Sequence, residues 1–291
     1  MSTSREIKIL HLEPTDVCQA ACPMCARETD RQFDRTRHNH LTIDQILANF
    51  PDTAIMNLDK MFMCGVYGDP AAGRHTMDIY RYFRRINPEI TLGMNTNGAI
   101  QNTAWWQILG EIFHRERDYV VFSIDGLEDT NHIYRRGVDW HKLMDNVQAY
   151  IATGARAHWD MLVYRHNEHQ VEHCETLARD LGFSWFRAKV SKRGFTKSLE
   201  SPVAWRLPVV KTGTIQCKAL QERSLYIDAL GRASACCWLG ARQSDFIDDD
   251  VASVSKTWHT PHPYPICQAT CATTNDQSSF TGQWQREVAF V

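Results

Sequence analysis

Short apolar runs and amphipathic stretches alternate from residue 6 to about residue 190. Six of the runs have the length and composition of β-strands, at 6–12, 60–66, 90–96, 119–125, 155–164 and 183–190. Five stretches between them carry apolar residues at helical spacing, at 42–50, 76–86, 103–115, 139–152 and 167–181. Thr42 and Gln45 fit a capping box at the start of the first predicted helix.

The repetition of strand and helix predicts the fold class and the place of an active site. Strands that alternate with helices form parallel βαβ units. About six such units, two fewer than close a full barrel, predict an α/β protein with a partial parallel (β/α)6 barrel. In such folds the chemistry gathers at the C-terminal ends of the strands.

The pattern changes after residue 190. Residues 192–208 are polar and contain prolines, which indicates a linker. Residues 224–238 then predict a β-hairpin that turns at Leu230 and Gly231. We therefore expect two domains: a barrel at 1–195, and a linker with a small hairpin-containing domain at 196–291.

Composition narrows the class of partner. The chain has 32 basic and 34 acidic residues, so its bulk charge does not indicate a nucleic-acid partner. No apolar run approaches the roughly 20 residues that span a bilayer, and the N-terminus lacks the pattern of a secretory signal. We therefore expect a cytoplasmic protein that does not bind membranes. In a reducing cytosol its ten cysteines favour metal ligation or redox chemistry over disulfides.

The first cysteine cluster has three members, Cys18, Cys22 and Cys25, just after the first predicted strand. A structural zinc site takes four protein ligands, so zinc would need a histidine such as His38 or His40 as the fourth. A [4Fe–4S] cubane is held by thiolates, normally one for each iron. Three cysteines would leave one iron of a cubane open to an exogenous ligand.

The spacing Cys-x3-Cys-x2-Cys in this stretch resembles the signature of the radical S-adenosylmethionine (radical SAM) superfamily, which lies in the loop after the first barrel strand. Met24 stands where that family usually has an aromatic residue. The resemblance implies that the open iron binds the amino and carboxylate groups of SAM. It further implies reductive cleavage of SAM to methionine and a 5′-deoxyadenosyl radical, with the protein positioning and shielding the cofactor.

Two stretches at later strand ends match the family's cofactor contacts. Tyr67, Gly68 and Asp69, followed by Pro70, resemble its Gly-Gly-Glu-Pro motif, whose backbone holds the SAM amino group, with Asp in place of Glu. Asn97, in the stretch NTNG at 95–98, matches a common Thr-Asn-Gly ending after the third strand. Each is also an ordinary turn signal when it is taken alone.

The fourth predicted strand runs into a third such stretch, SIDG at 123–126, which is followed by YRRG at 134–137. In the family's auxiliary-cluster branch a serine and a nearby arginine contact the SAM carboxylate or ribose, and Ser123 and Arg135 are the matching positions, with Arg136 as the fallback. A guanidinium fork suits a carboxylate. Asp125 is either part of this cofactor site or a cap of the helix that follows.

The second cysteine cluster has the pattern Cys217-x13-Gly231-x4-Cys236, followed by Cys267-x3-Cys271. This pattern resembles the SPASM domain or its shorter relative, Twitch. Most of the second half of the full SPASM pattern is missing, so the chain resembles the Twitch form. The resemblance implies a second, auxiliary [4Fe–4S] cluster with all four irons ligated, by Cys217, Cys236, Cys267 and Cys271. A four-cysteine zinc site is the alternative. Adjacent strand residues point to opposite faces, so we expect only one of Cys236 and Cys237 to be a ligand, and we favour Cys236.

The resemblance covers nearly the whole chain and implies a radical SAM enzyme that abstracts hydrogen from a C–H bond of a small-molecule or peptide substrate. A peptide- or protein-modifying maturase and a glycyl-radical activase are alternatives within this class. A non-catalytic, zinc-stapled binding protein is the alternative outside it. An electron donor such as a flavodoxin or ferredoxin is the partner that the enzyme interpretation requires.

Overall fold

The computed structural model describes residues 7–191, 195–204, 210–211, 215, 217–242, 267, 271 and 273–274. Within them, eight strands form one sheet in the order β6-β5-β4-β3-β2-β1-β8-β9. Six strands are the predicted ones: β1 (Ile9–Leu12), β2 (Lys60–Met63), β3 (Thr91–Thr96), β4 (Tyr119–Ser123), β5 (Ala157–Val163) and β6 (Trp185–Val190). All neighbours among these six pair in parallel, so the partial (β/α)6 barrel is confirmed.

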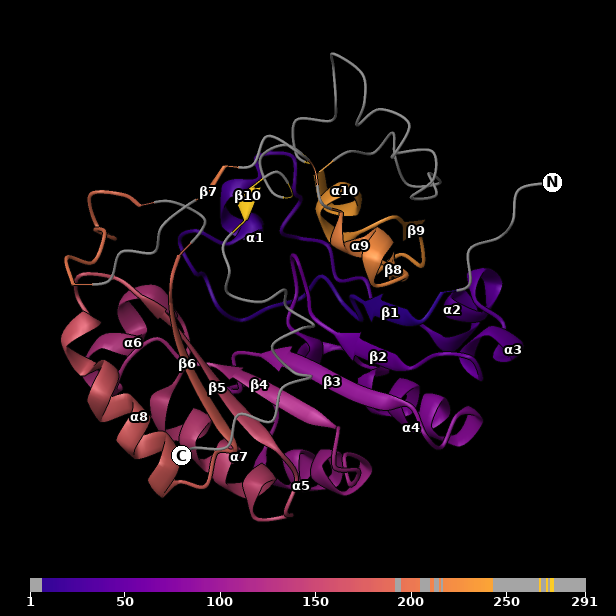
Figure 1. The fold of residues 1–291 in the computed structure, drawn as a ribbon, viewed down its shortest axis with the longest axis horizontal. Helices are drawn as coiled ribbons and strands as arrows, with labels where there is room; N and C mark the ends of the chain where they lie inside the picture. The colour runs from indigo at the N-terminus through magenta and orange to yellow at the C-terminus, as the bar shows by residue number, and fades with distance from the viewer. Residues whose placement is uncertain are drawn as a thin grey trace.

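Helices cover one face of this sheet (Figure 1). They are α2 (Ile43–Asn49), α3 (Asp52–Ile55), α4 (Thr76–Ile86), α5 (Thr103–Ile112), α7 (Trp140–Ile151) and α8 (Val171–Asp180). The capping box of Thr42 and Gln45 at the start of α2 is confirmed. The helix predicted at 167–181 divides into a 3-10 turn, η2 (Glu168–Gln170), and α8.

The strands follow the two-residue alternation of a sheet with two different faces. In β5, Trp159, Met161 and Val163 are buried in the hydrophobic core against the helices. His158 and Asp160 alternate with them and therefore lie on the opposite, concave face. This alternation divides each strand between the core and the interior of the open barrel.

Three short elements near the strand ends were not predicted: α1 (Ala26–Thr29), the 3-10 turn η1 (Pro70–Ala72) and α6 (Glu128–Tyr134). At three to seven residues they are too short to show a clear apolar period. Each follows a loop that carries predicted site residues.

The predicted hairpin is present, and it joins the barrel sheet. Its strands are β8 (Ser224–Ile227) and β9 (Ala233–Ser234), which pair in antiparallel fashion, and Gly231 in the turn has a φ of 80°. Strand β8 also pairs in parallel with β1, so the hairpin extends the core sheet. The expectation that Cys236 and Cys237 lie on a strand is wrong, because Cys237 begins helix α10 (Cys237–Arg242).

The remaining described elements are α9 (Lys218–Gln221) and the antiparallel pair of β7 (Val210–Lys211) with β10 (Thr273–Thr274). Much of the domain predicted at 196–291 lies outside the described residues, so the domain boundary stays a prediction. Among the helices that the structure describes, none has the length and apolar character needed to cross a membrane.

Candidate active site

Cys18, Cys22 and Cys25 lie in the loop between β1 and α1, at the C-terminal end of the first strand. The Cys25 N–H donates to the Cys22 carbonyl oxygen over 2.9 Å, which makes the second half of the motif a tight turn. Burial, the Asp69 carboxylate and the thiols of Cys22 and Cys25 together raise the pKa of the Cys18 thiol to about 12, against a lowering by the Ala20 N–H. The three thiols therefore lie within electrostatic range of one another.

Two neighbouring loops hold this cysteine loop in place. The Asp69 N–H donates to the Val17 carbonyl oxygen over 2.9 Å, and the Ala21 N–H donates to the Arg136 carbonyl oxygen over 2.8 Å. Gly137, with a φ of 82°, allows a close approach, because a Cβ there would stand 2.9 Å from the Gln19 carbonyl oxygen. The predicted stretches after β2 and β4 thus contact the first cluster directly.

Asp69 joins the loop after β2 to the end of β3. Its carboxylate accepts hydrogen bonds from the Thr96 hydroxyl, from the Asn97 N–H and side-chain amide, and from the Ala71 N–H, over 2.7–3.0 Å. Burial raises the pKa of Asp69, although these hydrogen bonds lower it. The Asp69 side chain therefore positions two loops of the site.

Asn97 extends this network to the cysteine loop. Its side chain exchanges hydrogen bonds with the Gln19 side chain over 2.7 and 3.2 Å. Its Nδ2 also lies 3.7 Å from the Cys18 Sγ. The prediction that Asn97 belongs to the site thus agrees with its position, while its contact with a cofactor stays a prediction.

Glu13, which follows β1, is a site residue that the sequence analysis missed. Its Oε1 accepts hydrogen bonds from three successive N–H groups, those of Val66, Tyr67 and Gly68, over 2.7–3.1 Å. Its Oε2 accepts a hydrogen bond from the Tyr226 hydroxyl. Burial raises the pKa of Glu13 to about 7, against the lowering by these four donors. The sequence feature that could have identified Glu13 is an acidic residue directly after a buried strand.

In the loop after β2, Tyr67 makes side-chain contacts and Gly68 allows close packing. The Tyr67 hydroxyl donates to Asp30 over 2.7 Å, and its ring stacks on Phe33 with centroids 4.2 Å apart. A Cβ on Gly68 would stand 2.0 Å from the Thr15 carbonyl oxygen. Only glycine therefore allows this loop to pack on the chain that leads to Cys18.

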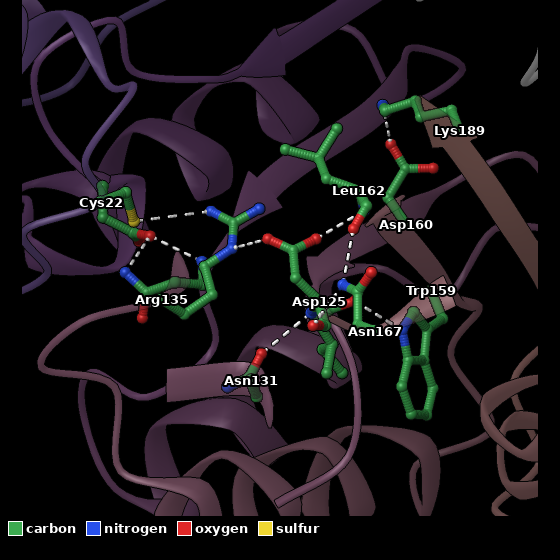
Figure 2. Close-up of polar contacts among 12 residues, drawn as sticks. Cys22, Asp125, Asn131, Arg135, Trp159, Asp160, Leu162, Asn167 and Lys189 are labelled. Carbon is green, nitrogen blue, oxygen red and sulfur yellow. Dashed lines mark hydrogen bonds and ion pairs between the residues drawn. The ribbon is translucent and has the colours of Figure 1, made fainter. Parts of the chain in front are cut away.

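Arg135 and Asp125 form a buried ion pair beside the cysteine loop (Figure 2). Arg135 Nε donates to Asp125 Oδ2 over 2.7 Å, and Arg135 Nη1 lies 4.0 Å from the Cys22 Sγ. Burial alone would lower the pKa of Arg135, but the Asp125 carboxylate and the Cys22 thiol raise it above its ordinary value. The guanidinium is therefore a fixed positive charge at the first cluster.

Asp125 does not cap the helix that follows, so that alternative is wrong. The N-cap of α6 is Leu127, which has no side-chain cap hydrogen bond. The other oxygen of Asp125, Oδ1, accepts from the Leu162 N–H over 2.6 Å, which connects the ion pair to β5. Both carboxylate oxygens are thus directed at Arg135 and Leu162 and away from the start of the helix.

Ser123 ends β4 and is partly buried. Within the described part of the chain, its hydroxyl makes no hydrogen bond to another side chain or to the backbone. It pairs in register with Asp160 of β5. Its predicted contact with a cofactor remains a prediction.

The second cysteine cluster is partly assembled by the described residues. Burial raises the pKa of Cys236, and the thiols of Cys217 and Cys267 are close enough to contribute to its value of about 11. The same cysteines pack around Ala219, Ala235 and Leu239. Cys271 is partly buried. All ten cysteines fall within the described residues, and none forms a disulfide.

Cys237 faces a different environment from its neighbour Cys236. Burial raises its pKa, and so do Cys236, Cys64 and Glu13. These last two lie at the C-terminal ends of β2 and β1. Cys237 therefore points towards the barrel strands, whereas Cys236 lies with Cys217 and Cys267.

The donor set at the first cluster fits an iron–sulfur cubane. N–H groups of Asn97, Arg135 and Ala20 are directed at the sulfurs of Cys18 and Cys22, at 3.4–4.0 Å, and would stabilise thiolate charge. Across the described ranges, no three histidine, cysteine or acidic side chains form a group that could hold a single metal ion. A cubane makes a different demand, because each thiolate binds its own iron.

Comparisons with known proteins agree with this geometry. A family model described as the Radical SAM superfamily matches residues 12–180, which is more than half of the chain. No curated protein is significantly similar to the chain in sequence.

Solved structures share the fold at low sequence identity. The crystal structure of Streptococcus suis SuiB bound to S-adenosylmethionine is 12% identical, with a TM-score of 0.60, and the match covers 88% of this chain and 67% of SuiB. A histidine-tagged anSMEcpe with bound AdoMet is 14% identical, with a TM-score of 0.57, over 79% of this chain and 71% of that one. The chain thus spans about two thirds of the length of SuiB.

Proposed function

Because this chain belongs to the radical SAM superfamily, we propose that Cys18, Cys22 and Cys25 hold a [4Fe–4S] cluster that binds SAM and cleaves it reductively. The observation that carries the proposal is the convergence of the three thiols with N–H donors at the ends of the parallel strands. When bound, the cluster and SAM supply a 5′-deoxyadenosyl radical that abstracts hydrogen from a substrate C–H bond.

The chain's own residues bind and orient SAM in this proposal. Glu13 engages the N–H groups of residues 66–68 and so holds that loop in one conformation. We assign backbone carbonyl oxygens of the loop to the SAM amino group. Arg135, which Asp125 fixes, and Ser123 face the SAM carboxylate or ribose, because a guanidinium and a hydroxyl both donate hydrogen bonds to oxygen.

The substrate is a small molecule or a peptide. SuiB has been crystallised with its precursor peptide SuiA, and anSMEcpe with the Cp18Cys peptide. These peptide complexes of proteins with the same fold make a peptide the first substrate class to test. A flavodoxin or ferredoxin is the class of electron donor that the reaction needs.

A direct test measures SAM cleavage. Protein reconstituted without oxygen, with SAM and dithionite, is expected to form 5′-deoxyadenosine, which chromatography with mass detection quantifies. Cys18→Ala is expected to abolish the product, whereas Cys174→Ala, which changes a cysteine of α8 that is buried in the core, is the matched control. The proposal fails if the parent protein forms no product, or if Cys18→Ala forms it at the parental rate.

We further propose that Cys217, Cys236, Cys267 and Cys271 hold an auxiliary [4Fe–4S] cluster. The packing of Cys236 beside Cys217 and Cys267 supports it. The parent protein should then contain about eight irons, from two cubanes. Cys236→Ala should lower this to about four, whereas Cys237→Ala, whose thiol faces Cys64 and Glu13, should retain the full number. A parent protein that contains about four irons and one tightly bound zinc would favour the zinc alternative.

A further inference from the structure

Three charged side chains meet on the concave face of β5 and β6. Arg187 Nε donates to Asp160 Oδ1 over 2.7 Å, and Arg187 Nη2 forms an ion pair with Asp160 Oδ2. Lys189 Nζ also donates to Asp160 Oδ2, over 2.5 Å. One carboxylate therefore serves two cations, and the three residues are called the Asp160 triad below.

The strand register places the Asp160 triad inside the open barrel. Asp160 pairs with Arg187 and Leu162 pairs with Lys189, while the alternate residues of both strands pack against the helices. The side chains of Asp160, Arg187 and Lys189 are 6%, 15% and 28% exposed. Lys189 is thus the most exposed member of the triad.

The Asp160 triad carries an excess positive charge. The carboxylate of Asp125, an acid that also acts electrostatically on Lys189, is engaged by Arg135. Two carboxylates then oppose three cations among these five groups, all of them largely buried. The pKa of Asp160 is lowered: burial raises it, but Lys189 and Arg187 outweigh that effect. The Asp160 carboxylate is therefore ionised. Burial lowers the pKa of Lys189 and raises that of Asp125, and in both cases the opposite charges nearby counter the effect. With all five groups ionised, they together carry one net positive charge.

The ion pair of Asp160 in β5 with Arg187 in β6 already connects the two strands, so this connection does not require Lys189. Arg187 already binds both oxygens of Asp160, which is the fork geometry that arginine forms with a carboxylate. In the described part of the chain, Lys189 has Asp160 as its one hydrogen-bond acceptor, although an ammonium group has three N–H donors. A largely buried cation is costly unless an anion accompanies it.

The Asp160 triad also lies next to the proposed SAM site. Leu162, two residues beyond Asp160, donates its N–H to Asp125, which fixes Arg135 beside Cys22 (Figure 2). Ser123 pairs in register with Asp160 itself. A molecule bound against Lys189 would therefore occupy the barrel interior close to the residues assigned to SAM.

We propose that Lys189, with Arg187 held in place by Asp160, binds a carboxylate group of the substrate. The inference rests on the proposed function, because it concerns the substrate of that same site. It narrows the substrate class to small molecules or peptides that carry a carboxylate near the reacting carbon.

The experiment compares two small probes that differ in one group, acetyl-glutamate methylamide and acetyl-glutamine methylamide. Their affinities for the reconstituted, SAM-saturated full-length protein are measured by anaerobic titration calorimetry. The acidic probe should bind at least about tenfold more tightly, as a charge-assisted hydrogen bond to a buried cation predicts. Lys189→Gln should abolish this preference and Lys189→Arg should retain it.

A matched control is Lys142→Gln, which removes a lysine from the exposed surface of α7 and should retain the preference. Thermal unfolding of each variant establishes that it is folded. If Lys189→Gln is not folded, Lys189→Met, which also removes the charge, carries the test. Equal binding of the two probes, binding by neither, or a preference that survives Lys189→Gln overturns the inference. So does a preference seen without SAM that SAM eliminates, because the SAM carboxylate would then occupy the triad.

Failure of this inference is distinct from failure of the proposed function. Formation of 5′-deoxyadenosine by the parent protein tests the function and needs no carboxylate probe. A protein that cleaves SAM but shows no preference for the acidic probe retains the function and loses the carboxylate subsite.

Discussion

The hydroxyl of Tyr226, in β8, donates a hydrogen bond to the carboxylate of Glu13, which follows β1. The same carboxylate accepts the N–H groups of Val66, Tyr67 and Gly68 from the loop after β2. Glu13 therefore connects the C-terminal hairpin to the loop that we assign to the SAM amino group. The two residues are 213 positions apart in the sequence.

We expect Tyr226→Phe to weaken SAM binding several-fold while the first cluster is retained. The variant loses a hydrogen bond to a buried charged group, which contributes about 1.5–3 kcal/mol, and frees the loop at 66–68. The measurement is SAM affinity by titration of the reconstituted protein. Tyr82→Phe is the control, since the Tyr82 hydroxyl also donates to a carboxylate, that of Asp52, at the start of α3. Equal loss of SAM affinity in both variants would contradict the link through Glu13.

Gly68→Ala is expected to reduce SAM cleavage at least about tenfold, because the new methyl group would stand 2.0 Å from the Thr15 carbonyl oxygen and a misplacement near 1 Å can cost far more. The loop would have to move away from the chain that carries Cys18. Gly154→Ala is the control: its φ of 83° strains an added side chain, but nothing lies within 4 Å of it. If the two variants lose activity alike, a general loss of stability and not the contact with Thr15 explains the result.

Asp125→Asn and Arg135→Gln are each expected to lower the free energy of unfolding by about 3–5 kcal/mol, because each leaves one buried charge without its partner. The double variant should lose clearly less than the sum of the two. Denaturant titration of the four proteins in the same metal state measures this coupling. Additive losses would show that the two side chains do not act as a pair.

The protein is expected to lose stability as the pH falls from about 6.5 to about 4, in part through His11. Burial lowers the pKa of His11 to about 4, so in that range the unfolded chain binds a proton that the folded chain does not. The effect reaches roughly 3 kcal/mol at its lower end. Since a carbonyl oxygen only accepts, neutral His11 donates through Nε2 to Cys64, over 2.7 Å.

His11→Gln should flatten this pH dependence, because glutamine does not titrate. The measurement is the difference in unfolding free energy between variant and parent at several pH values from about 7 to about 4. His141→Gln, at a position that is 82% exposed, should leave the slope of the parent unchanged. Some slope remains in His11→Gln, because burial also lowers the pKa of His158 to about 3. A slope as steep as that of the parent would contradict the role of His11.

Local patterns were enough to predict the barrel. The six parallel strands, the capping box of α2 and the hairpin at Gly231 depend on periods, caps and turn residues that lie within a few positions of each other. The cysteine motif is equally local. The stretches around Asp69, Asn97 and Arg135 were predicted as site residues from their resemblance to motifs of the family, which lie after successive strands, and parallel strands end at one edge of a sheet.

The short helices could not be predicted from the sequence, for a physical reason. Helix α6 has seven residues, too few to define a period, and it begins after Leu127, which provides no capping side chain. Its end places Arg135 against Asp125, so the true role of that aspartate depended on an element that left no pattern. The same holds for Cys236 and Cys237, which a short helix and not a strand directs to different neighbours.

By itself the sequence determined the barrel strands, the longer helices and which residue types gather at the strand ends, because propensity, spacing and turn chemistry act over short distances. The tertiary structure alone decided which distant side chains meet: Glu13 with Tyr226, Arg135 with Asp125, and Asp160 with both Arg187 and Lys189. Such contacts depend on strand order and register, which bring together residues whose separation along the chain gives no sign of it.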